Sequence, residues 1–295
     1  MMWQRTARIC VVALGLSLEP SAFSQTPAPR FEVQVGSQTI TIPAPEGFER
    51  LDGVSAKQDE LLAQFAGTNR QLIFFGSPDA VAAARRGEPS HSERNFNAQT
   101  LRSLEDQALT PEDFERLRDE TEAEILRLGT QFDSLMGKSM ANASQSLSER
   151  LKEDVEIRVG MPVPLGIFER TRDSLGFSML LKTDLAVSGQ QSSGLSIVAC
   201  MVVRARDRWL YLYTTAPRTN DADEQWARAE VTKWRNAIFS ANGQTDAPAT
   251  AAAASSPAPF NAIFLGLGLG SAAAGAALLI SLVVRRFRAS PSDSL

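Results

Sequence analysis

Residues 195–216 read LSIVACMVVRARDRWLYLYTTA, and this stretch decides the fold. Two runs rich in apolar residues, Leu195–Arg206 and Arg208–Ala216, meet at Arg206-Asp207, a pattern typical of a tight β-hairpin. Strands joined by so short a turn must pair antiparallel, because a parallel crossover needs about a dozen residues or more. The sequence therefore predicts an antiparallel sheet built around this pair of strands.

Shorter strand signals precede this hairpin. An opening hairpin is expected around Gly36-Ser37, where two alternating segments meet. The remaining strands are expected where apolar or alternating runs are bounded by turn residues. The expected strands are Phe31–Val35, Gln38–Ile42, Gln71–Phe75, Arg94–Leu101, Gly166–Arg172 and Gly176–Leu185.

Helical spacing appears in three places: Ala56–Phe65, a long charged region at 110–151, and a final helix through about Ser240. In the charged region Thr110 is the expected N-cap, with Asp113 completing a capping box. Its charged side chains are most simply a solvated helix face; they are Glu112, Asp113, Glu115, Arg116, Arg118, Asp119, Glu120, Glu122 and Glu124.

The final helix is expected to begin after Asn220 and to face the sheet with its apolar side chains. Those side chains are Trp226, Val231, Trp234 and Ile238. Along the chain the order is strands, helices, strands, helix. This order predicts an α+β domain at residues 25–242, in which helices pack on an antiparallel sheet.

Three features together resemble the PsbP-like and DcrB-like group of exported bacterial domains. They are the opening hairpin running into TIPAPEGF at Thr41–Phe48, the series of antiparallel strands, and the closing helix with Trp226 and Trp234. The resemblance covers about Phe31–Ser240 and implies an α/β/α sandwich, often non-enzymatic, in proteins whose roles are in assembly or are unknown. It transfers no catalytic residue, and the long charged region at 110–151 departs from the compact version of that fold.

The N-terminus, residues 1–24, has the parts of a secretory signal peptide. Arg5 and Arg8 precede the short apolar core Ile9–Leu18, and small residues end at Ser24, where cleavage is expected. The alternative is an uncleaved signal anchor. Cleavage would leave the domain exported.

The C-terminus reads as a membrane anchor. Residues 243–259 form an Ala/Pro/Ser linker, and 260–284 contain no charge over a length sufficient to cross a bilayer core of about 30 Å. Positive charge follows at Arg285, Arg286 and Arg288, so the tail 285–295 is expected in the cytoplasm and the domain outside it. The anchor makes the membrane the first expected partner.

Small residues recur every four positions in the expected span, at Gly266, Gly270 and Ala274. Such a face lets two helix backbones approach closely, which predicts a homodimer through the transmembrane helix. The alternative is that glycine and alanine are simply common in this span.

Little in the chain predicts chemistry. The whole chain carries −4; the signal carries +1 and the tail +2, so the exported part carries −7, which disfavours nucleic acid as a partner. His91 is the single histidine and is expected in a solvated loop, while Cys200 is expected to be a buried apolar residue. The sequence predicts no catalytic residue, cofactor or metal site.

Three functional classes follow. The first is a membrane-tethered, non-enzymatic binding or assembly module that faces the periplasm or cell exterior, with a protein partner still to be identified. The second is an exported enzyme whose site is not readable from the sequence. The third is a surface-sorted protein whose C-terminal helix is removed.

Overall fold

The computed structural model describes residues 28–66, 68–88, 92–125, 154–188 and 190–245, together with 141, 144–145 and 148–149. The expected signal, membrane span and tail lie outside these residues, as do His91, Gly266, Gly270 and Ala274. Within the described ranges, no helix combines the length and the apolarity that crossing a membrane requires. The predictions about the two ends of the chain therefore stay predictions.

Two antiparallel sheets form the β part of the molecule. The first is the hairpin of β1 (Arg30–Val35) and β2 (Gln38–Pro43). The second has eight strands in the order β3-β4-β5-β10-β9-β8-β6, and β7 pairs with β8 beyond this path. These strands are β3 (Glu49–Arg50), β4 (Asn69–Gly76), β5 (Asn95–Leu101), β6 (Val155–Val159), β7 (Val163–Arg170), β8 (Ser174–Val187), β9 (Gln190–Ala205) and β10 (Arg208–Pro217).

The two predicted hairpin turns are confirmed. Arg206 and Asp207 have φ values of +48° and +59°, the left-handed pair that a two-residue hairpin turn requires. Gly36 in the β1–β2 turn has φ +54°, and a Cβ built there would lie 2.4 Å from the Glu105 carbonyl oxygen. Gly36 is therefore fixed both by its backbone conformation and by the close approach of the Glu105 segment.

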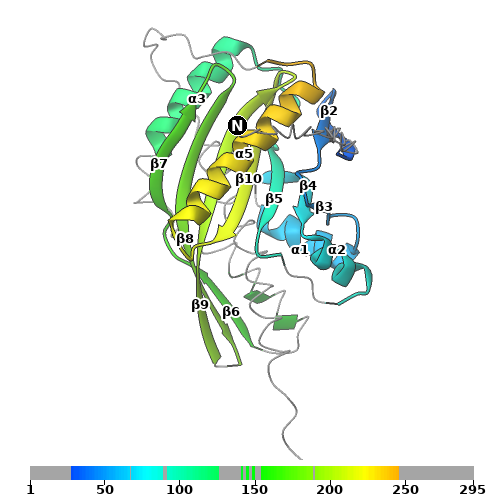
Figure 1. Ribbon diagram of the computed structural model, residues 1–295, viewed down its shortest axis with the longest axis vertical. Coiled ribbons are helices and arrows are strands. Elements are labelled where there is room, and N and C mark those ends of the chain that lie inside the picture. Colours follow the sequence, from blue (N-terminus) through cyan, green and yellow to red (C-terminus); the bar gives the residue numbers. More distant parts are fainter. Residues whose placement is uncertain are drawn as a thin grey trace, which may run out of the picture.

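One face of the large sheet is covered by α5 (Asp221–Ala241), which runs across β8, β9 and β10 in Figure 1. The Asn220 side chain caps this helix, and Asp223 completes the capping box. Val231, Trp234 and Ile238 are buried against the sheet, as predicted. The β1–β2 hairpin adds its apolar side chains to the same core.

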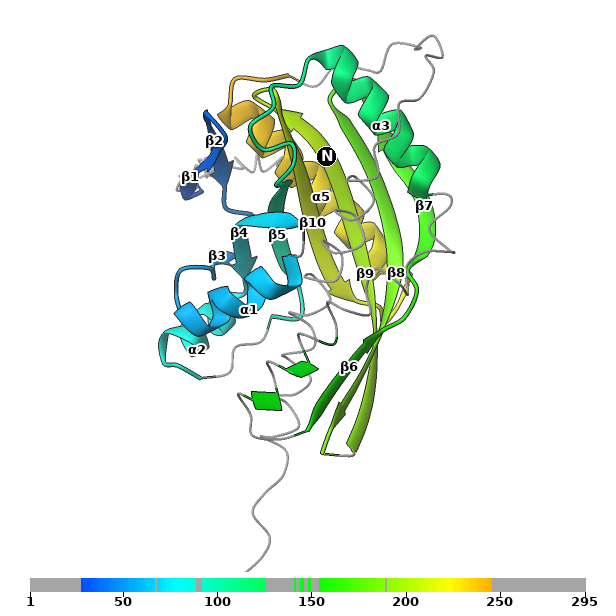
Figure 2. The ribbon, with the colours of Figure 1, turned by 180° about the vertical axis from the view of Figure 1, so that it is seen from behind.

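The opposite face, seen in Figure 2, carries three further helices of the described part of the chain. They are α1 (Ala56–Ala66), α2 (Pro78–Arg85) and α3 (Pro111–Ile125). Leu62 of α1 and Val81 of α2 pack around Phe74 of β4. Phe114 of α3 packs against Trp209, with ring centroids 5.3 Å apart. The fold is thus mixed α and β, with helices packed on antiparallel sheets.

The predicted helical region 110–151 is confirmed for its first part only. The Thr110 hydroxyl accepts from the Asp113 amide at 3.1 Å, which caps α3 as expected. α3 ends at Ile125, and most of residues 126–153 lie outside the described part of the chain.

The strands around β8 are longer than predicted. β8 and β9 continue past the apolar pattern to Val187 and Gln190, and β6 pairs with β8 rather than with its sequence neighbour β7. These three strands project beyond the body as an arm, visible at the bottom of Figures 1 and 2. Backbone pairing sustains the arm where side chains are polar, so hydrophobic periodicity could not predict its length.

Candidate binding site

Polar side chains on β5 point away from α5 yet are fully buried. Phe96 and Ala98 belong to the core beneath α5, so the alternation of side chains along a strand turns Asn95, Asn97 and Gln99 to the opposite face. All three have no exposed surface. β5 is a central strand, and polar residues buried there need hydrogen-bond partners.

The neighbouring strand β10 adds two hydroxyl groups to this face. Tyr213 pairs with Asn97, and Thr215 pairs with Asn95. Directly opposed residues in an antiparallel pair have Cβ atoms about 5 Å apart, so the four side chains form one contiguous patch. We call Asn95, Asn97, Tyr213 and Thr215 the polar block; all four are fully buried.

A ladder of amides leads to one edge of the polar block. The Asn69 amide donates to Gln99 Oε1 at 2.8 Å, and the Gln99 amide donates to Gln71 Oε1 at 3.3 Å. The Gln71 amide in turn donates to Asn97 Oδ1. These three bonds join the amides of β4 and β5 in a row that ends at Asn97.

Several atoms of the polar block lack a hydrogen-bond partner within the described residues. In this described part of the chain four atoms have no partner: Asn95 Nδ2, Asn95 Oδ1, Asn97 Nδ2 and Thr215 Oγ1; the Tyr213 hydroxyl lies beside the Cys200 thiol. Two more unpartnered hydroxyls, those of Ser196 and Thr183, lie on the same face toward the arm. Each buried unsatisfied group costs about 1–3 kcal/mol, so a cluster of them is a poor structural solution.

The polar block is electrically neutral. Burial raises the pKa of the Tyr213 hydroxyl well above its ordinary value, and it does the same to the pKa of the neighbouring Cys200 thiol. Cys200 pairs with Tyr213 in the β9–β10 register and is fully buried, as the sequence predicted. Neither group ionises near neutral pH, so this face offers hydrogen bonds rather than charge.

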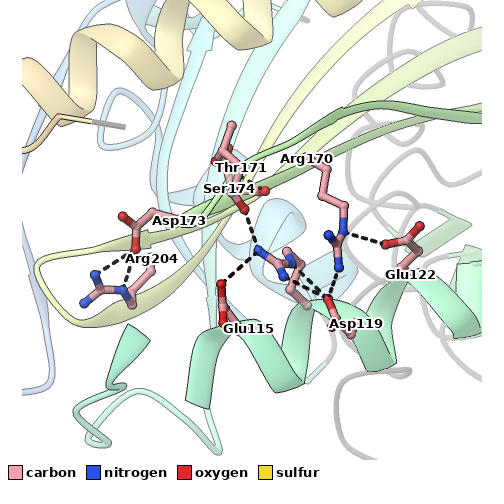
Figure 3. A network of polar contacts seen from close by, with 9 residues as sticks. Glu115, Asp119, Glu122, Arg170, Thr171, Asp173, Ser174 and Arg204 are labelled. Atoms are coloured by element: carbon pink, nitrogen blue, oxygen red, sulfur yellow. Dashed lines mark hydrogen bonds and ion pairs between the residues drawn. The ribbon is translucent and has the colours of Figure 1, made fainter. Parts of the chain in front are cut away.

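The charged groups near this face are paired with one another, as Figure 3 shows around the β7–β8 turn. Arg204 binds Asp173 at 2.7 Å, and both side chains are nearly buried. Arg170 reaches Asp119 of α3 at 2.7 Å and Glu122 at 3.2 Å. These ion pairs connect α3 to the β7–β8 region of the sheet, and the charged side chains of the network are paired with one another.

The prediction that Arg118 lies on a solvated helix face is wrong. Its side chain has no exposed surface. Its guanidinium donates to the Thr171 carbonyl at 2.5 Å and to Asp119 at 3.0 Å. Position 118 lies next to Leu117 on the buried side of α3, and charge type alone did not reveal that face.

The described residues give no group of three or more His, Cys, Asp or Glu placed to hold a metal ion. The predicted helix-association face, Gly266, Gly270 and Ala274, cannot be compared with this site because it lies outside the described residues. The polar block itself was not predicted. In the sequence, Asn95, Asn97 and Gln99 alternate with apolar residues. This pattern normally indicates a strand with one face in solvent, so it predicts a buried polar cluster only when both faces of the strand are known to be covered.

Comparison with known proteins adds little. No family model and no curated protein matches the chain. Among solved structures, the Saccharomyces cerevisiae Ran-binding protein Mog1p is similar over 73% of this chain and 93% of its own, with 12% identity and a TM-score of 0.27. At that identity and TM-score the likeness carries no argument about binding or activity.

Proposed function

We propose that the protein is a single-pass membrane protein whose sheet domain is displayed on the periplasmic or outer side as a non-enzymatic binding module. The tether is the uncharged segment 260–284, and the linker 243–259 holds the domain away from the bilayer. The helix–sheet–helix layering of an α/β/α sandwich belongs to the same proposal.

The limits of the fold support this arrangement. β1 begins at Arg30, a few residues after the expected cleavage at Ser24. α5 ends at Ala241, immediately before the expected linker. A folded unit that fits between a signal peptide and a linker is what an exported, tethered domain needs.

The observation that carries the binding role is the polar block. Four polar atoms on one buried sheet face have no partner within the described residues, and they destabilise the domain unless something else supplies their partners. Proteins retain such unfavourable local solutions chiefly at functional sites. Binding is favoured over catalysis because the block carries no charged side chain, and burial keeps the Tyr213 hydroxyl and the adjacent Cys200 thiol protonated.

Topology is tested on the full chain with reporters fused after Leu295. A reporter active only in the cytoplasm should work, and one active only in the periplasm should be silent, because the arginine cluster retains the tail inside. The protein should also resist carbonate extraction from membranes. Activity of the periplasmic reporter, or release by carbonate, would contradict the proposal.

The mass of the mature protein distinguishes a retained membrane anchor from surface sorting, in which the C-terminal helix is removed. A retained anchor gives a chain ending at Leu295, whereas a sorted protein ends near 259. Intact-mass measurement of the membrane-extracted protein decides between them, and the same spectrum checks cleavage after Ser24.

A further inference from the structure

We propose that the arm binds a single neutral sugar ring in an open hollow formed by its three strands. The hollow has a volume of about 280 Å³ and is lined by residues of β6, β8 and β9. Its polar lining residues are Glu156, Arg158, Lys182, Asp184, Gln191 and Ser193. This site is separate from the polar block, so it goes beyond the binding role proposed above.

The hollow forms where a small side chain lies at the centre of a cross-strand row. Ala186 of β8 pairs with Glu156 of β6 on one side and with Gln191 of β9 on the other. Paired residues point to the same face, with Cβ atoms about 5 Å apart. The methyl group of Ala186 therefore forms the floor of the hollow, and the two longer side chains form its walls.

The hollow opens on the sheet face that α5 covers in the body of the molecule. Ile197 of β9 belongs to the core beneath α5, and alternation along the strand puts Ser193 and Gln191 on the same face. The arm projects from the body (Figure 1), so these side chains are accessible. The side chains of Arg158 and Lys182 are 73% and 58% exposed.

Two ion pairs hold the polar groups of the hollow in place. Arg158 contacts Glu156 Oε1 at 2.7 Å. Lys182 contacts Asp184 Oδ1 at 3.1 Å, and the Ser193 hydroxyl donates to the same oxygen at 2.6 Å. Each carboxylate therefore contacts its neighbours through one oxygen, and within the described residues its other oxygen remains available to accept from a ligand.

The balance of charge in the hollow favours a neutral ligand with several hydroxyl groups. Two carboxylates and two cationic groups cancel, and an ionic ligand gains little from exposed charges that are already paired. The Ser193 hydrogen bond and the two cationic neighbours lower the pKa of Asp184, so it accepts hydrogen bonds at neutral pH. A hydroxyl both donates and accepts, so adjacent hydroxyls on one ring can bind carboxylate oxygens and cationic groups together.

The volume of the hollow sets the size and the affinity of the ligand. It lies just below the range of about 300–1,000 Å³ that small-molecule sites occupy, which suits one ring rather than an oligosaccharide. At the binding efficiency usual for small ligands, a ring of about a dozen non-hydrogen atoms should bind with a Kd of about 1–10 mM.

The probe is methyl α-D-glucopyranoside, studied by ligand-observed saturation-transfer NMR. The protein is the full chain in a detergent without sugar head groups. We expect saturation transfer to the ring protons. Glucuronate adds a negative charge, glucosamine adds a positive charge, and glycine betaine is a zwitterion without hydroxyls; each should bind at least about threefold more weakly.

Matched variants locate the site. Ala186→Leu fills the hollow without changing a charge, so it should abolish saturation transfer. Ala229→Leu makes the same replacement at an exposed position of α5 and should leave the signal unchanged. Asp184→Asn keeps the shape of the side chain but removes a charged acceptor, so it should raise the Kd at least about fivefold. Far-UV circular dichroism checks that each variant is folded.

Four outcomes would overturn the proposal. Absence of saturation transfer to the glucopyranoside would show that the hollow binds no sugar, and tighter binding of a charged or zwitterionic ligand would show that the ligand class is wrong. A signal retained in folded Ala186→Leu would place the sugar elsewhere on the protein. An unchanged Kd in Asp184→Asn would remove the carboxylate from recognition. The reporter and carbonate experiments test the tether without any ligand, so its failure is distinct from these outcomes.

Discussion

Truncating Trp234 to alanine should remove the central contact between α5 and the large sheet. The side chain is 2% exposed and lies edge-on to Phe96 and Phe75, with ring centroids 5.4 and 5.9 Å away. Its indole N–H donates to the Pro43 carbonyl at 2.9 Å, which also fixes the end of β2. One residue thus joins helix, sheet and hairpin.

The expected cost has two parts. Loss of a buried Trp side chain to alanine costs about 3–5 kcal/mol, including the cavity. The Pro43 carbonyl loses its buried donor, which adds about 1–3 kcal/mol. Trp234→Phe should show mainly the second part. Since folded domains are stable by about 5–15 kcal/mol, the alanine variant should be close to unfolding.

The assay is urea unfolding of the full-length protein in detergent, followed by far-UV circular dichroism. Trp226→Ala is the matched control on the same helix, because Trp226 is only partly buried and stacks under Arg94 at 4.3 Å. It should cost clearly less than Trp234→Ala. If the two variants lose equal stability, or Trp234→Ala loses none, the account of α5 as the cover of this face is refuted.

Three further results are expected. Arg118→Ala should lower stability by about 1–3 kcal/mol in urea unfolding, because the Thr171 carbonyl loses its donor while Asp119 keeps Arg170; an unchanged midpoint would contradict the buried role. Hydrogen bonds from the Thr219 hydroxyl and from the amides of Thr219 and Asn220 hold the pKa of Asp223 at about 2. Its ordinary pKa is about 3.9, so its contribution to stability is present above about pH 4 and is lost as pH falls toward 2. Asp223→Asn should flatten acid unfolding in that window, and an identical acid profile for the variant would argue against it. Gly270→Ile should abolish self-association of a peptide of residues 258–290 in an in-membrane assay, and equal association of wild type and variant would reduce the span to a plain anchor.

Local signals predicted the elements well. The Thr110–Asp113 box, the Asn220 cap and the Arg206-Asp207 turn each depend on atoms within a few residues, so the sequence carries them in full. Pairing between β9 and β10 followed from the shortness of their turn. Features that depend only on contacts between residues close in the sequence can therefore be predicted from the sequence.

Features decided by distant contacts were not predicted. The pairing of β6 with β8 skips the strand between them, and the arm extends where side-chain periodicity has ended. Arg118 is buried because the β7–β8 turn presents the Thr171 carbonyl to it from 53 residues away. The sequence of each of these segments does not reveal the distant residues that determine its pairing or its burial.

The polar block also depends on distant contacts, because elements far away in the sequence bury it. Its buried polar groups lower the stability of the domain, and the proposed binding role would explain why they are present. Alternation of Asn95 and Asn97 with apolar neighbours is ordinary for a strand with one wet face, and only the burial of both faces makes it costly. A sheet selected for stability alone would carry apolar residues at these positions, as β9 does at Val198 and Val202 on the same face. The amide ladder bonds Gln71 and Gln99 to their neighbours, whereas both polar atoms of Asn95 have no partner within the described residues. Apolar substitution at Asn95 should therefore stabilise the domain, because it removes two buried polar atoms that have no partner in this part of the chain.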